Sequence, residues 1–283
     1  MITSKTTHQQ RCLQIVKEHP CYSSDAHHKF ARIHLPVAPK CNIGCNFCVR
    51  KFNCANESRP GVTSKLVTPK EAIELVRATV KADPNLRVVG ISGPGDPLTS
   101  DATFETLRFV KMEFPHLTRC ISTNGLLLPE KICALKDLGV NTLTVTINAV
   151  DPAVGEQIYS FVNYTGETLY GKEAFEVLSK NQLTGLSLAA ELGMAVKVNT
   201  VFIPGINSNH IIEVARAVQK RGAYIMNVMP LIPMGNFAHI PAPSLKEVHM
   251  VRNVCGEILV QFHKCVQCRA DAVGIPGKEV GGN

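Results

Sequence analysis

The stretch ARIHLPVAPKCNIGCNFCVRKFNCANESRPG, residues 31–61, decides the fold and carries the most recognisable chemistry of the chain. Its centre, CNIGCNFC, places Cys41, Cys45 and Cys48 on one tight loop. Thiolates are soft ligands that suit iron–sulfur clusters, zinc and Cu(I). A cubane [4Fe–4S] cluster needs a ligand on each iron, so three cysteines leave one iron able to bind a substrate. A structural zinc ion would instead require four ligands in a closed tetrahedron, so the motif favours a cluster.

The composition is that of an ordinary globular protein that handles metal. With 283 residues, 45% of them hydrophobic, the chain can form one α/β barrel-sized domain or two smaller ones. No apolar run approaches the length of a membrane span, and the polar start MITSKTTHQQ is not a signal peptide, so we expect a cytoplasmic protein without a membrane partner. Eleven cysteines in that compartment indicate metal binding rather than disulfides. The basic residues are scattered, which argues against a nucleic-acid partner.

Outside the opening stretch, strand-like segments alternate with helical ones. We expect strands at 33–39, 87–92, 117–125, 141–148, 195–205 and 224–233. We expect helices at 8–18, 69–82, 101–114, 129–138, 172–193, 208–221 and 244–262. Thr68 and Glu71 form a capping box around Pro69, and Gly193 suits a C-terminal cap. Six β/α units in alternation predict an α/β fold with a parallel sheet.

Polar residues gather where a barrel would bind its ligands. The cysteine motif directly follows the first strand, and βα-repeat folds carry their chemistry at the C-terminal ends of strands. One face of strand 141–148 is polar; its members are Thr142, Thr144, Thr146 and Asn148. Such a row on a buried strand indicates a ligand-filled barrel interior, and the alternative is an exposed strand face. The glycines of GPGDP, residues 93–97, let backbone approach a ligand closely.

The CX3CXΦC pattern, in which Φ is aromatic, resembles the signature of the radical S-adenosylmethionine (SAM) superfamily. The resemblance implies a partial (β/α)6 barrel whose open iron holds the amino and carboxylate groups of SAM. One electron from the cluster then splits the sulfonium into methionine and a 5′-deoxyadenosyl radical. It also implies SAM or cluster contacts, which we assign to Phe47, Gly95, Asp96, Ser122, Asn124, Thr146, the Val198 backbone and Asn199.

Further potential metal ligands lie outside the three-cysteine motif: Cys21, His34, Cys54, Cys120, Cys265 and Cys268. The CXXC spacing of Cys265 and Cys268 suits a redox pair, half a zinc site or half a cluster site. Cys120 shares a strand face with Ser122, and His34 in an apolar strand is ordinarily a core histidine. Together the six make two more three-ligand sites. We expect the remaining cysteines to be packing or surface residues: Cys12, Cys133 and Cys255.

Several longer stretches resemble one family within this superfamily. The stretches ARIHLPVAPKCNIGCNFC, FNCANESRPGV, SGPGDPL, STNG and CVQCRADAVGIPG resemble the NifB family of nitrogenase cofactor maturases. That family implies a lyase-type radical SAM enzyme of nitrogen fixation, which fuses two substrate cubanes, K1 and K2, into an eight-iron core around a carbide from the SAM methyl group. By the resemblance, K1 is held by His34, Cys54 and Cys120. K2 is held by Cys21, Cys265 and Cys268.

The resemblance also implies partners and a domain layout. The partners are a cluster donor, an electron donor and a downstream cofactor carrier or scaffold. The layout is an extension at 1–30, the barrel at 31–243 and a cluster-binding segment at 244–283, with both extensions closing over the barrel mouth. Two alternatives stay open: a radical SAM maturase whose auxiliary clusters only relay electrons, and a non-enzymatic iron–sulfur scaffold. Glu57 and Arg59 suit a surface ion pair that contributes little to stability.

Overall fold

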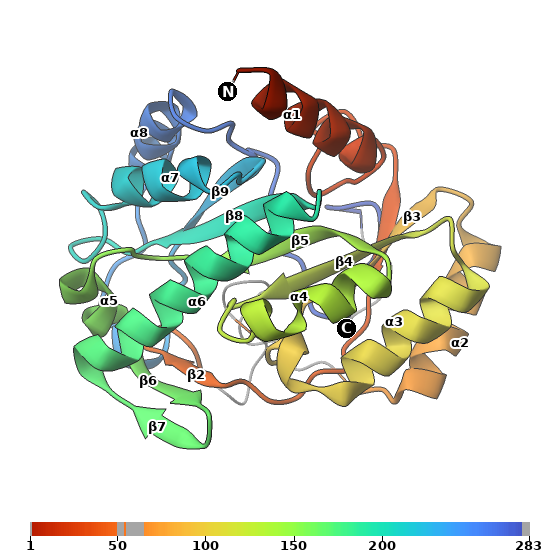
Figure 1. Cartoon of the computed structure of the whole chain (residues 1–283), viewed down its shortest axis with the longest axis horizontal. Coiled ribbons are helices and arrows are strands. Elements are labelled where there is room, and N and C mark those ends of the chain that lie inside the picture. Colours follow the sequence, from red (N-terminus) through yellow and green to blue (C-terminus); the bar gives the residue numbers. More distant parts are fainter. Residues whose placement is uncertain (1, 50–53, 55–64, 279–283) are drawn as a thin grey trace.

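A computed structural model of the chain describes residues 2–49, 54 and 65–278, with side chains from residue 8 onward. Within these residues the central feature is a seven-stranded sheet with the strand order β10-β1-β3-β4-β5-β8-β9. Its strands are β1 (Ala31–His34), β3 (Leu86–Ile91), β4 (Thr118–Thr123), β5 (Val140–Thr146), β8 (Ala195–Phe202), β9 (Ile225–Pro230) and β10 (Val273–Gly274). The sheet curls, and helices cover its outer side (Figure 1).

Neighbouring strands from β1 to β9 of this described sheet are parallel, while β10 pairs antiparallel with β1 at the edge. The connecting helices are α2 (Pro69–Ala82), α3 (Asp101–Glu113), α4 (Leu128–Asp137), α6 (Gly171–Glu191), α7 (Ile211–Lys220) and α8 (Leu245–Gly256). The predicted partial (β/α)6 barrel is therefore confirmed. So is the capping box at the start of α2, where Thr68 and Glu71 bond each other's backbone N–H groups.

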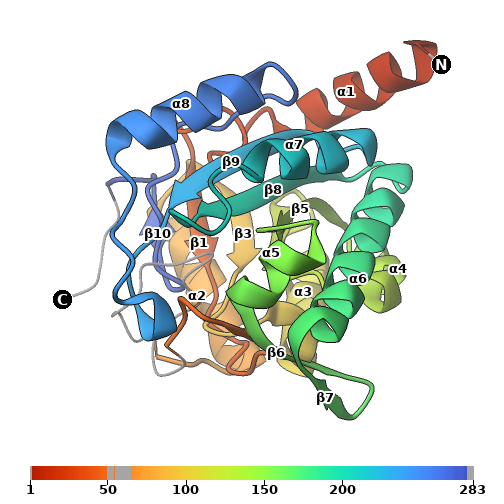
Figure 2. The same ribbon diagram turned by 90° about the vertical axis from the view of Figure 1, so that its left-hand side faces the viewer.

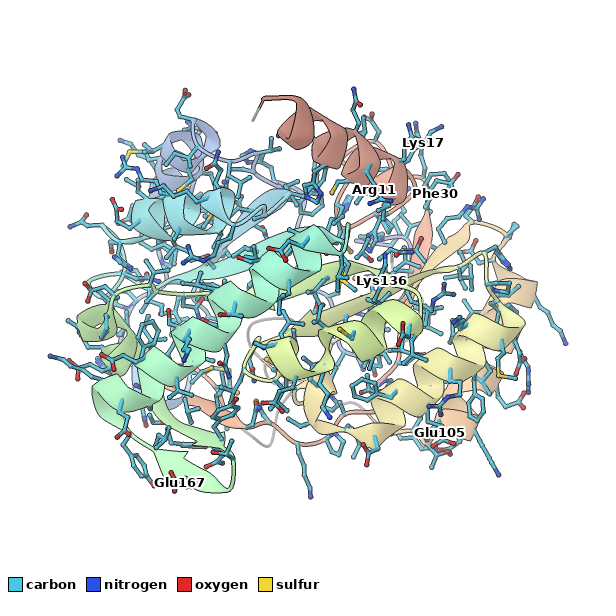
Figure 3. All side chains as sticks on the ribbon, viewed as in Figure 1. Arg11, Lys17, Phe30, Glu105, Lys136 and Glu167 are labelled. Carbon is cyan, nitrogen blue, oxygen red and sulfur yellow. The ribbon has the colours of Figure 1, made fainter. Side chains whose placement is uncertain are left out.

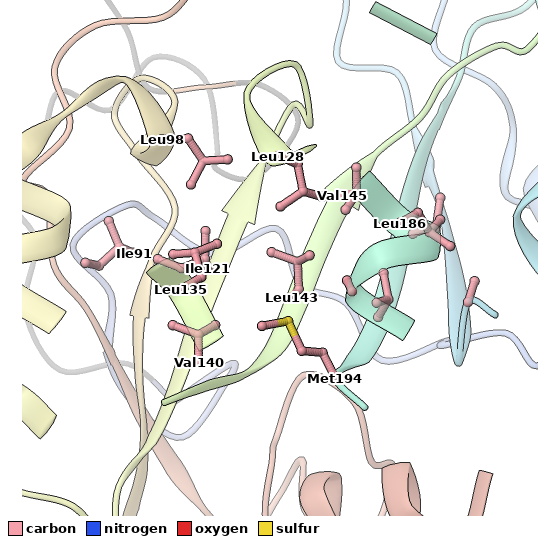
Figure 4. Close-up of a cluster of buried hydrophobic side chains, with 14 of the residues drawn as sticks. Ile91, Leu98, Ile121, Leu128, Leu135, Val140, Leu143, Val145, Leu186 and Met194 are labelled. Carbon is pink, nitrogen blue, oxygen red and sulfur yellow. The ribbon is translucent and has the colours of Figure 1, made fainter. Parts of the chain in front are cut away.

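The two faces of the sheet differ in chemistry. Outward side chains such as Leu143 and Val145 of β5 pack against helix residues such as Leu128 and Leu186 (Figure 4). The inward residues of β5 are the predicted threonine row, and Thr142, Thr144 and Thr146 are all at most 2% exposed. This burial excludes the exposed strand face and places a polar surface inside the barrel. Charged side chains such as Glu105 and Lys136 lie over the outer helices (Figure 3).

The N-terminal segment packs at the end of the barrel where the strands begin. Helix α1 (Ile2–Val16) starts earlier than the expected helix at 8–18. The thiol of Cys12 lies 3.8 Å from the carbonyl oxygen of Met194, just before β8 begins. Figures 1 and 2 place α1 at one end of the barrel and the hairpin of β6 (Tyr159–Tyr164) and β7 (Glu167–Leu169) at the other. Helix α1 thus lies at the opposite end of the barrel from this hairpin, and the expected closure of the extensions over the mouth stays a prediction.

A small second sheet was not anticipated from the sequence. Strand β2 (Ile43–Cys45), inside the cysteine motif, pairs antiparallel with β6, and β6 pairs with β7. Helix α5 (Pro152–Ile158) leads into this hairpin. The hairpin turn is Thr165-Gly166, and both residues have positive φ, as two-residue turns of this kind require.

The last helix and the segment after it also differ from expectation. Helix α8 ends at Gly256 rather than near 262. Beyond it the chain becomes extended, since the N–H of Phe262 donates to the carbonyl oxygen of Met226 on β9. The chain then crosses toward β1 and forms β10 there. No helix in the described part of the chain is both long and apolar enough to cross a membrane.

Candidate metal centre

The cluster loop, residues 41–48, is braced by the second sheet. Ile43 lies opposite Val162, and Cys45 lies opposite Tyr159. The N–H of Asn46 donates to the carbonyl oxygen of Ile158 at 2.9 Å, which extends this bracing past the end of β2. The loop is therefore held by backbone hydrogen bonds on one side.

The GPGDP turn after β3 is hydrogen-bonded to the segment that leads into the cluster loop. The N–H of Gly95 donates to the carbonyl oxygen of Ala38 at 2.6 Å, and the N–H of Asp96 donates to that of Lys40 at 2.7 Å. A Cβ atom at Gly95 would overlap the Lys40 carbonyl group. Glycine is therefore required for this close approach. The predicted role of Gly95 as a SAM contact stays a prediction, with its N–H engaged by Ala38.

Asp96 is a buried hydrogen-bond centre. Its carboxylate accepts from the N–H of Leu98 at 2.9 Å, the N–H of Asn124 at 2.6 Å and the hydroxyl of Thr123 at 2.8 Å. Burial raises the pKa of Asp96, while its bonds from Asn124, Thr123 and Leu98 act in the opposite direction. The carboxylate thus joins the turn after β3 to the turn after β4.

Asn124 carries this connection on to the cluster loop. Its side-chain amide donates to Oδ1 of Asn42 at 2.7 Å and lies 3.6 Å from Sγ of Cys41. On helix α6, the Gln182 amide donates to the carbonyl oxygens of Asn124 and Thr146 at 2.8 and 2.9 Å. The position of the first motif cysteine is therefore set by a chain of polar contacts that reaches helix α6.

A first cavity collects the motif cysteines and most of the predicted SAM contacts. It is lined by Cys41, Ile43, Cys45, Cys48, Cys54, Gly95, Asp96, Ser122, Thr123, Asn124 and Thr146. Among the described residues, no three His, Cys, Asp or Glu side chains are grouped so as to hold one metal ion. A cubane needs no such group, because each thiolate binds a different iron. The donor set therefore fits a cluster better than a tetrahedral zinc ion.

A second cavity lies deeper in the barrel and collects most of the remaining predicted ligands. The cysteine and histidine side chains lining it are His19, Cys21, His27, His34, Cys120, Cys265 and Cys268. Cys21, Cys265 and Cys268, far apart in the sequence, are brought together here as predicted. Burial raises the pKa of the Cys268 thiol to about 12, against the opposing effect of Arg32. Ser122 lines both cavities, so they adjoin each other.

The predicted trio His34, Cys54 and Cys120 is divided between the two cavities. Cys54 faces the first cavity, whereas His34 and Cys120 face the second, on either side of Ser122. Glu57 and Arg59 lie outside the described residues. The cysteines without a predicted ligand role behave as packing or surface residues: Cys12 and Cys255 are buried, and Cys133 is exposed.

His34 is oriented by a backbone contact. Its Nδ1 lies 3.0 Å from the carbonyl oxygen of Arg269, the residue after Cys268. Because a carbonyl can only accept, this bond places the proton on Nδ1 and leaves the lone pair on Nε2. Burial, aided by the charge of Arg32, lowers the pKa of His34 to about 4. The imidazole is therefore neutral at pH 7, which is the form that binds metal.

The remaining predicted contacts lie further from the first cavity. Phe47 is 1% exposed and packs beneath the loop, with its ring centroid 6.4 Å from that of Phe237. Val198 is buried in the core, and its backbone lies in the ladder between β5 and β9. Asn199 lines the second cavity, where its Oδ1 accepts from the amide of Asn227 at 3.0 Å. Their predicted roles toward SAM stay predictions.

Two basic residues also line the second cavity; the sequence indicated Lys197 as a candidate SAM contact, whereas Arg32 was missed as a site residue. Arg32, entirely buried, and Lys197, 6% exposed, both line this cavity. Arg32 precedes His34 by two positions, so the two share a strand face. An arginine in an otherwise apolar strand was the available signal.

Comparison with known proteins identifies the family. The model of the radical SAM superfamily matches residues 35–218. The chain is 47% identical to the FeMo cofactor biosynthesis protein NifB of Klebsiella pneumoniae over 92% of its own length, but spans 57% of that protein. It is 45% identical to NifB of Chlorobaculum tepidum, of which it spans 63%. It is 44% identical to NifB of Methanocaldococcus jannaschii, covering 92% of this chain and 87% of that protein.

Two solved structures of other proteins share this fold. Methylornithine synthase superposes with a TM-score of 0.58 at 17% identity, covering 90% of this chain and 70% of that one. SuiB of Streptococcus suis bound to SAM superposes with a TM-score of 0.57 at 14% identity, covering 89% and 53% of the two chains. At these identities the likeness concerns the fold.

Proposed function

Because the chain belongs to the NifB family of the radical SAM superfamily, we propose that it fuses two substrate cubanes into an eight-iron, carbide-containing precursor of the nitrogenase cofactor. The observation that carries this proposal is the pair of adjoining cavities that share Ser122. One holds the three-cysteine loop, and the other holds further thiols with an oriented imidazole. A SAM-derived group released in the first cavity thus has a short path to a substrate in the second.

The cluster loop would hold the resident [4Fe–4S] cluster through Cys41, Cys45 and Cys48. When bound, that cluster supplies the electron that splits SAM into methionine and a 5′-deoxyadenosyl radical. The chain's own groups prepare the site: Asn124 bonds beside the Cys41 thiol, and the Asp96 carboxylate holds the neighbouring turns together. Thr146 in the first cavity and Ser122, which lines both cavities, supply polar surface to SAM.

The substrate cubanes would be bound by three ligands each. K1 takes His34, Cys54 and Cys120, between the two cavities, and K2 takes Cys21, Cys265 and Cys268. Three ligands suit clusters that leave as product, because one iron of each stays available for joining. Imidazole is neutral and more easily displaced than thiolate, which suits K1. A first SAM donates its methyl group to a K1 sulfide. The 5′-deoxyadenosyl radical formed from a second SAM then abstracts a hydrogen atom from this methyl group, which begins the conversion of the methyl carbon to carbide.

Further reactants and partners follow from this chemistry. A ninth sulfur has to enter, a protein has to deliver the cubanes, and an electron donor has to reduce the resident cluster. A carrier or scaffold protein has to accept the product. Cysteine-bound, labile clusters suit the reducing cytoplasm. The two alternatives, an electron-relay maturase and a passive scaffold, differ from this proposal in needing no eight-iron product.

Two triple variants separate these functions. Alanine at Cys41, Cys45 and Cys48 should abolish 5′-deoxyadenosine formation under dithionite, because no resident cluster would be held there to bind and reduce SAM. Alanine at the three K2 ligands should remove about four irons per chain, one cubane's worth, while SAM cleavage continues and no eight-iron cluster forms. Cys133→Ala, on the surface, is the matched control and should change neither measurement. Unchanged iron content in the second triple variant would overturn the proposed K2 site.

A further inference from the structure

Arg32 is a wholly buried arginine that bonds directly to a predicted ligand. It lies on β1 and is 0% exposed. Its Nη1 donates to the carbonyl oxygen of Gly274 at 2.6 Å, and its Nη2 donates to Sγ of Cys268 at 2.9 Å. One guanidinium group therefore joins the barrel strand, the edge strand β10 and the CXXC segment.

A second cation lies across the same cavity. Lys197 on β8 points its ammonium nitrogen toward the carbonyl oxygen of Cys21, 3.4 Å away. The nitrogen is also 5.0 Å from the ring centroid of Tyr22 and 5.7 Å from that of Phe262. Among the described residues that line this cavity there is no aspartate or glutamate. The fixed charges lining it are thus positive, and they lie next to two of the three K2 cysteines.

We propose that Arg32 is a positioning residue for K2: its N–H···S bond to Cys268 persists when that sulfur binds iron, and it raises the reduction potential of the bound cubane. The proposal rests on the proposed function, because it takes Cys268 as a K2 ligand. Lys197 contributes a second positive charge on the Cys21 side of the same cubane.

The physical reason is the charge of the ligand. A cubane held by three thiolates is anionic, and burying an anion is costly unless cations or hydrogen bonds compensate. A hydrogen bond to the ligating sulfur stabilises the more negative, reduced state, which raises the reduction potential. Arginine suits the task because its planar fork directs one N–H at Gly274 and another at Cys268, whereas an ammonium group lacks that fixed geometry.

The test uses the full chain carrying alanine at the three cysteines of the cluster loop, reconstituted with iron and sulfide. Adding Cys268→Ala identifies the K2 signal by difference. Arg32→Met and Arg32→Lys are then compared by iron per chain and by redox titration monitored with paramagnetic resonance. Arg119→Met is the matched control, because Arg119 is also buried but bonds the carbonyl oxygen of Gly139 and no sulfur.

The expected result is a shift of the K2 potential to a more negative value in Arg32→Met, a smaller shift in Arg32→Lys and none in Arg119→Met. An unchanged potential in Arg32→Met overturns the proposal. If Arg32→Met takes up no K2, the lysine variant decides: a bound cubane of lowered potential supports the proposal, and no cubane or the parent potential overturns it. If Cys268→Ala itself removes no signal, the K2 site has failed rather than the role of Arg32.

Discussion

Replacing Asp96 by asparagine should destabilise the protein even without any cluster or SAM. The substitution preserves shape, but one carboxylate oxygen becomes an amide group that cannot accept. The hydroxyl of Thr123 can turn to accept from that amide, whereas either the N–H of Leu98 or that of Asn124 loses its acceptor. Burial raises the pKa of this carboxyl group, which means that burial disfavours its charge. Loss of the charge should therefore cost little, and the loss of a hydrogen-bond acceptor should dominate the effect.

An unsatisfied buried donor costs about 1–3 kcal/mol, which for a chain of this size corresponds to a fall in Tm of roughly 2–12 °C. Anaerobic urea and thermal unfolding of the cluster-free protein measure this directly. Glu105→Gln, the same chemical change on the exposed face of α3, is the control and should stay within about 0.5 kcal/mol of the parent. Unchanged stability of Asp96→Asn with weakened SAM binding would refute this reasoning and favour a direct contact to the SAM amino group.

Three further predictions concern other parts of the chain. The parent protein should show strong nitrogen coupling in pulsed paramagnetic resonance on reduced K1, and His34→Ala should remove it, whereas alanine at the exposed His116 should leave it; coupling that survives would reassign the ligand. Thr68→Ala should lower the free energy of unfolding in urea by about 1 kcal/mol by removing the cap of α2, and no change would disprove the capping role. Gly44→Ala should cost about 1–3 kcal/mol through overpacking against the Phe161 ring, and adding Phe161→Ala should recover part of this; equal stability of the single and double variants would contradict the steric explanation.

The features that the sequence predicts well are those decided within a few residues. The capping box at Thr68 and Glu71 starts α2 where expected because both partners lie in one turn. The period-two row on β5 is buried as predicted, since strand alternation is local. The cysteine motif indicates its chemistry through spacing alone.

The features that the sequence does not predict depend on distant partners. Strand β2 forms only because β6 lies beside it, and a three-residue strand has too little pattern to recognise. The turn at Thr165-Gly166 lacks the common asparagine or aspartate signal. The bond between Arg32 and Cys268 joins opposite ends of the chain. The division of His34, Cys54 and Cys120 between two cavities likewise depends on tertiary geometry.

The position of Cys21 and Cys265 in one cavity has a consequence for the order of events during synthesis. Cys21 leaves the ribosome before any barrel strand exists, while Cys265 emerges only after β9 has been made. At the usual rates of translation, on the order of 5–20 residues per second, the N-terminal cysteine waits many seconds for its partners. A cubane delivered before then would meet only one of the three proposed K2 cysteines. If the three cysteines hold K2 as proposed, loading of this cavity has to follow completion of the barrel, so synthesis of the chain rather than the supply of iron would set its timing.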